Sequence, residues 1–172
     1  METKTFLKFD VTPESEKRYT IKSSAFQEAV KSGLIKIYKI LNIEQRWIME
    51  GDKYTGRIRK TVDSTPKNKD KSPKFEHTVK HHVSKGMDYE ITTDINAEDY
   101  LLLGKLYKDK DIKSKLRVYV KDLSGKYDNY VITIDIPDDQ PEICWVEFET
   151  NDGNVEKDGF KKPDWIKDEV KG

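Results

Sequence analysis

The chain has 172 residues, of which 37% are charged and 35% are apolar, and its 32 basic residues balance its 32 acidic residues. This length suffices for one domain with a substantial core, and the nine Tyr, six Phe and three Trp residues exclude a disordered chain. Because the net charge is zero, the strong field of a nucleic-acid-binding or membrane-surface protein is not expected, and neither partner is predicted.

Cys144 is the single cysteine, which excludes an internal disulfide and a cysteine-rich metal site. It lies in an apolar segment, so we expect a buried thiol in a reducing compartment. The N-terminal sequence METKTFLKFD is charged from its second residue, and no run approaches the roughly 20 apolar residues of a membrane helix. These features predict a soluble, cytoplasmic protein.

Most of the chain is predicted to form short strands, because β-branched and aromatic residues alternate with polar ones between turn-forming clusters. Residues 1–13 are interpreted as an N-terminal extension, in which the apolar stretch 6–11 could add a further strand. The predicted strands are 14–21, 43–49, 54–60, 75–83, 87–95, 115–120, 130–136 and 143–150.

One helix is predicted after the first strand, because Ser24 and Gln27 form a capping-box pattern and Gly33 follows the last apolar residue. A short C-terminal helix is predicted to begin at Pro163, since proline is common in the first turn.

Another helix is predicted over residues 97–109, with Asn96 as its N-cap and Tyr100, Leu103 and Tyr107 at helical spacing. Residues 61–74 have almost no apolar side chains and predict a flexible loop.

Eight short strands with two intervening helices indicate a single mainly β domain, built as a closed antiparallel barrel or as a curled sheet.

Like charges recur two residues apart on several predicted strands. Glu147 and Glu149 flank Phe148, so both carboxylates lie on one strand face and the ring lies on the other. A solvent-facing surface is the simplest interpretation of any one pair, but like charges side by side destabilise a sheet. The same spacing relates Glu14 to Glu16, Arg57 to Arg59, Lys115 to Arg117, and Thr78 to Lys80.

The acidic pairs lie on the first and last strands and the basic pairs on middle strands. If these faces pointed into a barrel, carboxylates would face Arg and Lys side chains across its interior. Carboxylate oxygens suit divalent cations, while guanidinium and ammonium groups suit polyphosphate. The pattern therefore favours an interior that binds a metal ion and phosphates.

In their order and spacing, these motifs resemble the CYTH domain, also called the triphosphate tunnel metalloenzyme family. The family includes thiamine triphosphatase-like enzymes, inorganic triphosphatases and class IV adenylate cyclases. Three positions depart from its pattern: Arg18 replaces a lysine, Thr92 replaces a carboxylate, and Thr133 stands where an acidic residue is frequent, with Asp135 two residues later. The matching segments are ESEKR (14–18), IEQRWI (43–48), RIR (57–59), TVK (78–80), KLR (115–117), EFE (147–149) and PDWIKDEV (163–170), with Glu90 matching part of another.

The resemblance implies an α+β, mainly β fold, in which an eight-stranded antiparallel barrel forms a tunnel and helices pack outside. It implies that Mg²⁺ or Mn²⁺ is held by Glu14, Glu16, Glu147 and Glu149, and that Glu90, Glu147 or Glu149 contributes to catalysis. It also implies that a small-molecule triphosphate is gripped by Arg18, Arg57, Arg59, Lys80, Lys115 and Arg117.

The leading functional hypothesis is metal-dependent hydrolysis of inorganic triphosphate or of a nucleoside or thiamine triphosphate. The alternatives are an adenylate cyclase that forms cyclic AMP from ATP, a binding module that sequesters a nucleotide or polyphosphate without turnover, and a charge-rich domain with a protein partner. Loss of a carboxylate at Thr92 keeps the binding-module alternative open.

Three histidines, His77, His81 and His82, are interpreted as structural residues. Because His81 and His82 are adjacent, they would face opposite sides of a strand, whereas His82 shares its face with Lys80. Cys144 and Trp145 are interpreted as packing residues.

Overall fold

The structure is a computed structural model that describes residues 11–84, 87–150, 159–167 and 169–170. The first ten residues of the predicted extension 1–13, including most of the possible strand 6–11, lie outside this range. The first described strand begins at Val11.

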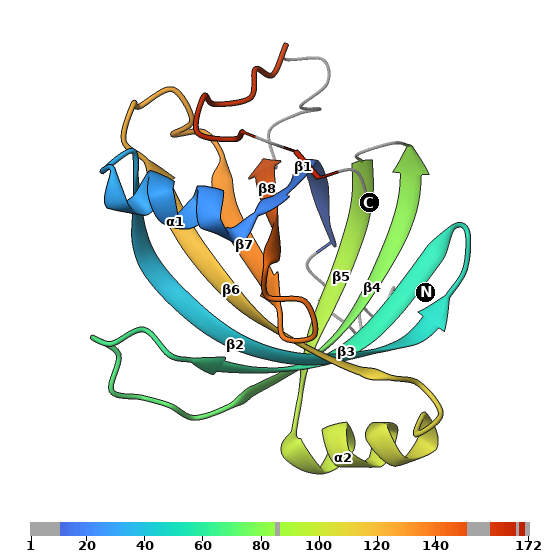
Figure 1. Ribbon diagram of the computed structural model, residues 1–172. Helices are drawn as coiled ribbons and strands as arrows, with labels where there is room; N and C mark the ends of the chain where they lie inside the picture. The colour runs from blue at the N-terminus through green and yellow to red at the C-terminus, as the bar shows by residue number, and fades with distance from the viewer. Residues whose placement is uncertain (1–10, 85–86, 151–158, 168, 171–172) are drawn as a thin grey trace, which may run out of the picture.

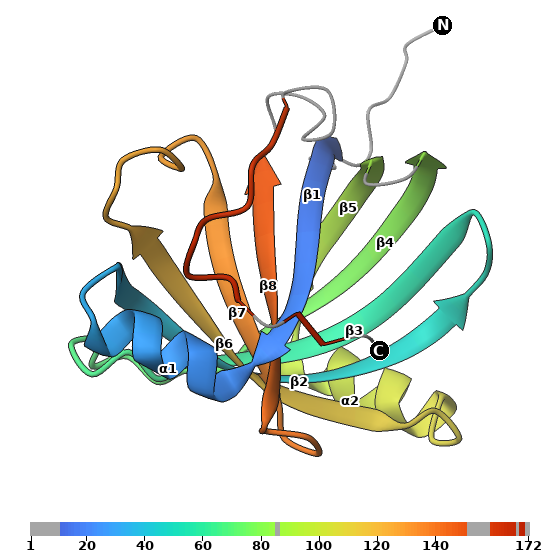
Figure 2. The ribbon, with the colours of Figure 1, turned by 45° about the horizontal axis from the view of Figure 1, so that its top comes forward.

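Within the described residues, eight antiparallel strands form a closed barrel in the order β1-β5-β4-β3-β2-β6-β7-β8 (Figures 1 and 2). This confirms a mainly β fold and selects the closed barrel over the curled sheet. The strands are β1 (Val11–Lys22), β2 (Ile35–Glu50), β3 (Tyr54–Asp63), β4 (Lys74–Ser84), β5 (Met87–Ile95), β6 (Ile112–Asp122), β7 (Val131–Pro137) and β8 (Ile143–Thr150).

Strand β1 closes the barrel because it pairs with two neighbours. Its first part, from Val11 to Ser15, pairs with β5, and the part from Ser15 to Lys22 pairs with β8. Strand β2 begins at Ile35, eight residues before the predicted start at Ile43, and pairs along most of its length with β6. The early part was missed because lysines interrupt its apolar alternation, although pairing with β6 satisfies its backbone.

Helix α1 (Ser23–Lys31) follows β1 directly and packs outside the barrel beside β1 and β2. The predicted capping box at Ser24 is wrong, because Lys22 is the N-cap and no side chain caps the helix. The start is fixed instead by Ser23, whose backbone and hydroxyl donate hydrogen bonds to the loop before β8. Gly33, with φ of 74°, follows the C-cap as predicted.

Helix α2 (Ala97–Leu106) lies on the other side of the barrel, near β3 and β4 (Figure 1). The Asn96 side chain accepts a hydrogen bond from the backbone of Asp99 at 2.7 Å, which confirms the predicted N-cap. The Tyr100 hydroxyl donates to Glu44 at 2.8 Å and its ring packs on Phe75, so this helical face contacts the barrel. Among the described residues, neither helix is long and apolar enough to cross a membrane.

The predicted C-terminal helix at Pro163 is wrong, since the described residues there form a turn. Trp165 and Ile166 are nevertheless buried in the core, and the Trp165 indole donates a hydrogen bond of 2.8 Å to Asp122. The loop predicted over 61–74 is shorter, because β3 extends to Asp63 and β4 starts at Lys74.

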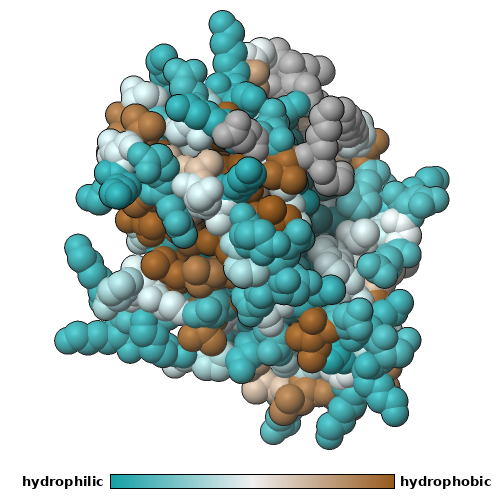
Figure 3. All heavy atoms as spheres, in the orientation of Figure 1, coloured by the Kyte–Doolittle hydropathy of each residue, from teal (hydrophilic) through white to brown (hydrophobic). Residues whose placement is uncertain are grey.

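The main hydrophobic core lies outside the barrel wall, beneath α1 and the C-terminal segment. Val146 and Phe148 of β8 point into it and are fully buried, as is Cys144, whose predicted burial is confirmed. Because alternate residues of β8 fill this outer core, the intervening ones face the barrel interior. Hydrophilic residues cover most of the face drawn in Figure 3, consistent with a charge-rich chain.

Candidate functional site

A cavity of about 700 Å³ occupies the barrel and is lined by residues from every strand. A smaller cavity of about 420 Å³ shares Arg59 and Arg117 with it and extends toward the loop after β3. Eight-stranded barrels are wide enough to be filled by side chains or to hold one small ligand. All the predicted phosphate-gripping residues line the large cavity, namely Arg18, Arg57, Arg59, Lys80, Lys115 and Arg117.

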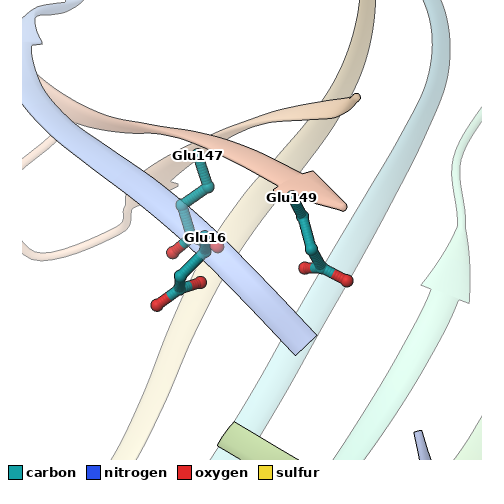
Figure 4. A group of neighbouring side chains, drawn as sticks. All are labelled: Glu16, Glu147 and Glu149. Atoms are coloured by element: carbon teal, nitrogen blue, oxygen red, sulfur yellow. The ribbon is translucent and has the colours of Figure 1, made fainter. Parts of the chain in front are cut away.

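Three of the predicted metal ligands, Glu16, Glu147 and Glu149, come together on neighbouring strands (Figure 4). Glu16 of β1 is directly opposite Glu149 of β8, and each of the three carboxylates offers an oxygen within 4.8 Å of the others. This donor set suits a hard divalent cation that takes oxygen ligands. Glu14 pairs with Asp88 through its backbone, but its side chain lies outside the described part.

Glu147 is held in place by Arg18, the residue opposite it on β1. The Arg18 Nε donates to the Glu147 carboxylate at 3.0 Å, and its terminal NH₂ group donates to the same oxygen. Burial alone would raise the pKa of Glu147, but the charges of Arg18 and Arg117 outweigh it and lower that pKa. Glu147 therefore stays ionised and available to a cation.

Trp145, interpreted from the sequence as a packing residue, instead lines the cavity. The Arg18 guanidinium lies 5.8 Å from the centre of its ring, which is within cation–π range. The misassignment arose because the apolar character of the segment outweighed the strand parity that Trp145 shares with Glu147. Parity was the informative signal.

Two of the basic residues that line the cavity, Lys115 and Arg117, share one partner, the fully buried Asp135. Its carboxylate accepts hydrogen bonds from Lys115 at 2.6 Å and from two nitrogens of Arg117 at 2.7 Å. Burial raises the pKa of Asp135, but hydrogen bonds and charge from Arg117 and Lys115 lower it overall. Burial, together with Arg117, lowers the pKa of Lys115 to about 8, so this lysine remains charged at neutral pH.

Arg59 is held by a neutral partner. Its Nε and one terminal nitrogen donate to the side-chain oxygen of Gln45 at 3.1 and 2.7 Å, and both residues are buried. Gln45 thus orients the guanidinium without neutralising it. Burial, and then the charges of Arg57 and Arg117, lower the pKa of Arg59 to about 9, which reflects concentrated positive charge. The segment IEQRWI contains Gln45, but its role as the partner of Arg59 follows from the register between β2 and β3.

Glu90, a predicted catalytic residue, also lines the cavity and is bonded to its neighbours. One carboxylate oxygen lies 3.3 Å from the Lys80 ammonium, and the other accepts the Thr92 hydroxyl at 2.9 Å. Thr92 in turn bonds to Thr78 at 3.0 Å. Thr92, a position where the CYTH resemblance predicts a carboxylate, therefore ties Glu90 to strand β4.

His82 lines the cavity together with Thr55 and Asp88, a group that the sequence interpretation missed. Its Nδ1 lies 2.7 Å from the Asp88 carboxylate and its Nε2 lies 3.3 Å from the Thr55 hydroxyl. His81 faces away and stacks on Tyr54 at a ring separation of 4.6 Å. The parity that His82 shares with Lys80 was the available signal.

No protein-family model matches the chain, and no curated protein matches it. Solved structures do share its fold. The PH1012 and PH1819 proteins of Pyrococcus horikoshii OT3 cover 84% of this chain and 82% and 81% of their own lengths, with TM-scores of 0.59 and 0.61 and 15% and 14% identity. A conserved hypothetical protein from Pyrococcus furiosus gives a TM-score of 0.60 at 16% identity, over 84% of this chain and 82% of its own. At these identities the likeness concerns the fold alone.

Proposed function

We propose that the barrel binds a triphosphate and, with Mg²⁺ or Mn²⁺, hydrolyses its terminal phosphoanhydride bond. The carrying observation is the cluster of Arg57, Arg59 and Arg117 in the cavity. Arg59 is oriented by a neutral partner, and burial together with the charges of the other two arginines lowers its pKa to about 9. Such a concentration of buried positive charge favours the binding of a multiply charged anion. Three carboxylates in the same cavity add the means of holding a cation beside it.

The phosphate ligands in this proposal are the cations that line the cavity. Arg57 and Arg59 on β3 and Arg117 on β6 supply guanidinium forks, which match phosphate oxygens geometrically. Lys80 and Lys115 supply point charges. The volume of about 700 Å³ falls in the range of small-molecule sites and admits a triphosphate with an organic substituent.

Glu16, Glu147 and Glu149 are the residues that would hold the cation, as the resemblance to the CYTH family also implies. A bound divalent ion would neutralise phosphate charge and make the bridging oxygen a better leaving group. The protein groups would position the chain of phosphates and neutralise charge that develops in the transition state. A water oxygen would bond to the terminal phosphorus as the bond from that phosphorus to the bridging oxygen breaks.

The test is a panel of inorganic triphosphate, ATP, GTP and thiamine triphosphate, each with Mg²⁺ or Mn²⁺. We expect metal-dependent release of phosphate from at least one of them, and none when the metal is chelated. Cyclic AMP formation from ATP would instead identify a cyclase. Tight binding of a panel member without any product would contradict hydrolysis and favour a binding module.

A further inference from the structure

Asp88, His82 and Thr55 form a chain of hydrogen-bonding groups that crosses three adjacent strands, β5, β4 and β3. The Asp88 carboxylate is 2.7 Å from His82 Nδ1, and His82 Nε2 is 3.3 Å from the Thr55 hydroxyl. All three side chains line the large cavity. The cavity itself is large enough for a ligand, so the imidazole faces the space where a substrate would lie.

The geometry determines which imidazole nitrogen can accept a proton. An ionised carboxylate only accepts hydrogen bonds, so Nδ1 carries the proton that points at Asp88. In the neutral ring, Nε2 is then the acceptor and takes its hydrogen bond from the Thr55 hydroxyl. The Thr55 hydroxyl thus marks a position from which a hydroxyl or a water molecule can donate to Nε2.

Two of the three predicted catalytic carboxylates, Glu90 and Glu147, are already engaged by neighbouring side chains. The two oxygens of Glu90 are engaged by Lys80 and Thr92, and the Glu147 carboxylate is engaged by Arg18. An ion-paired carboxylate is a weak base, because its cationic partner stabilises the deprotonated form. The Nε2 atom of His82, by contrast, has the neutral Thr55 hydroxyl as its neighbour at 3.3 Å.

We propose that His82 is the general base of the tunnel and that Asp88 is the residue that positions it. This rests on the hydrolysis proposed above and names the group that activates the water. His82 and Lys80 are two residues apart on β4 and line the same cavity, so they lie roughly 6.5 Å apart along the strand. A phosphate held by Lys80 would therefore lie in the same part of the cavity as the imidazole.

The proposed step balances without any further reactant. The water O–H proton moves to His82 Nε2 as the oxygen bonds to the terminal phosphorus, and the bond from that phosphorus to the bridging oxygen breaks. Inorganic phosphate and the remaining diphosphate group leave, and His82 returns its proton to solvent through its partly exposed ring. Asp88 stabilises the imidazolium that forms transiently.

The charged groups that line the cavity around His82 are Asp88 and Glu90 on β5, Lys80 on its own strand and Arg57 on β3. A protonated imidazole has no acceptor nitrogen and cannot act as a base. We therefore expect kcat of the wild-type protein to be lower at acid pH, and the measurement covers about pH 8 to 5.

The experiment compares kcat and KM for inorganic triphosphate with Mg²⁺ across this pH range in the wild type, His82→Gln, Asp88→Asn and His81→Gln. General-base catalysis contributes about 10²–10⁴ in rate, so His82→Gln should lower kcat at least about 100-fold, keep KM, and lose the fall at acid pH. Asp88→Asn should lower kcat about tenfold or more with KM unchanged. His81→Gln, on the outer face, should behave as the wild type.

Melting curves with and without triphosphate separate catalysis from folding. A His82→Gln protein that folds and is stabilised by the ligand as the wild type is, yet turns over slowly, supports the base. Unchanged kcat and pH dependence in His82→Gln, with an active wild type, would overturn the role of His82 as general base but not the hydrolysis. Absence of phosphate release from the wild type would overturn the hydrolysis, and the base with it.

Discussion

Replacing Glu147 with glutamine is expected to lower kcat for triphosphate hydrolysis by about 10²–10³-fold, the usual effect of removing one group that stabilises charge in a transition state. Glu147 is the buried member of the three-carboxylate cluster, and the side chains around it keep it ionised. Glutamine preserves the shape of the side chain but supplies a weaker oxygen ligand. Phosphate release at increasing Mg²⁺ or Mn²⁺ concentration measures the effect, and the half-saturating metal concentration should rise.

Glu28→Gln is the matched control for this experiment, because Glu28 is an exposed glutamate of α1 outside the barrel. Its kinetics should equal those of the wild type. Retention of full activity and of metal dependence by Glu147→Gln would remove Glu147 from the metal site.

Replacing Asp135 with alanine is expected to destabilise the protein by about 3–5 kcal/mol, the usual cost of removing one partner from a buried ion pair. The substitution leaves Lys115 and Arg117, both largely shielded from solvent, without their shared carboxylate. Urea denaturation measures the free energy of unfolding. Asp94→Ala is the control, because Asp94 is exposed and its pairing with Lys74 at 3.9 Å should contribute under about 1 kcal/mol.

The pH dependence of stability gives a second test of Asp135. Its folded-state pKa is lowered below the unfolded value of about 3.9, so its contribution is fully present above that value and is lost as the pH falls toward the folded pKa. The stability gap between wild type and Asp135→Ala should therefore be constant near neutral pH and shrink below about pH 4. A variant as stable as the wild type would show that the pair contributes nothing net.

Much of the fold could be predicted from alternation alone. The eight strands were found because each alternates an apolar face with a polar face at the two-residue period of a strand. The start of β2 at Ile35 was missed because lysines break the pattern there, although this part of the strand pairs with β6. The cap at Ser24 was wrong because the turn before β8, distant in sequence, fixes the start of α1.

The interior residues could also be predicted, because parity on a strand decides which side chains share a face. Arg57 and Arg59, for example, line the cavity as expected. The partners of these residues could not be predicted, since they depend on register across strands. Gln45 meets Arg59 and Asp88 meets His82 only because β2 pairs with β3 and β4 pairs with β5 as they do.

The position of the hydrophobic core links the fold to the proposed function. A barrel with an apolar interior would have its hydrophobic core inside the wall. Here Phe148 and its neighbours pack outward beneath α1 and the C-terminal segment, while Glu147 and Glu149 point inward. The stability supplied by the outer core leaves the interior free to concentrate charges that are costly to bury.

The central claim is that this interior is a site for a triphosphate and a divalent cation. Thermal unfolding with inorganic triphosphate and Mg²⁺ tests it most directly, because a ligand of the native state raises the melting temperature by mass action. At about 100 times the dissociation constant, we expect a rise of about 5–10 °C in the wild type and a much smaller rise in Arg59→Ala. No shift in the wild type at millimolar triphosphate, with or without metal, would contradict the account.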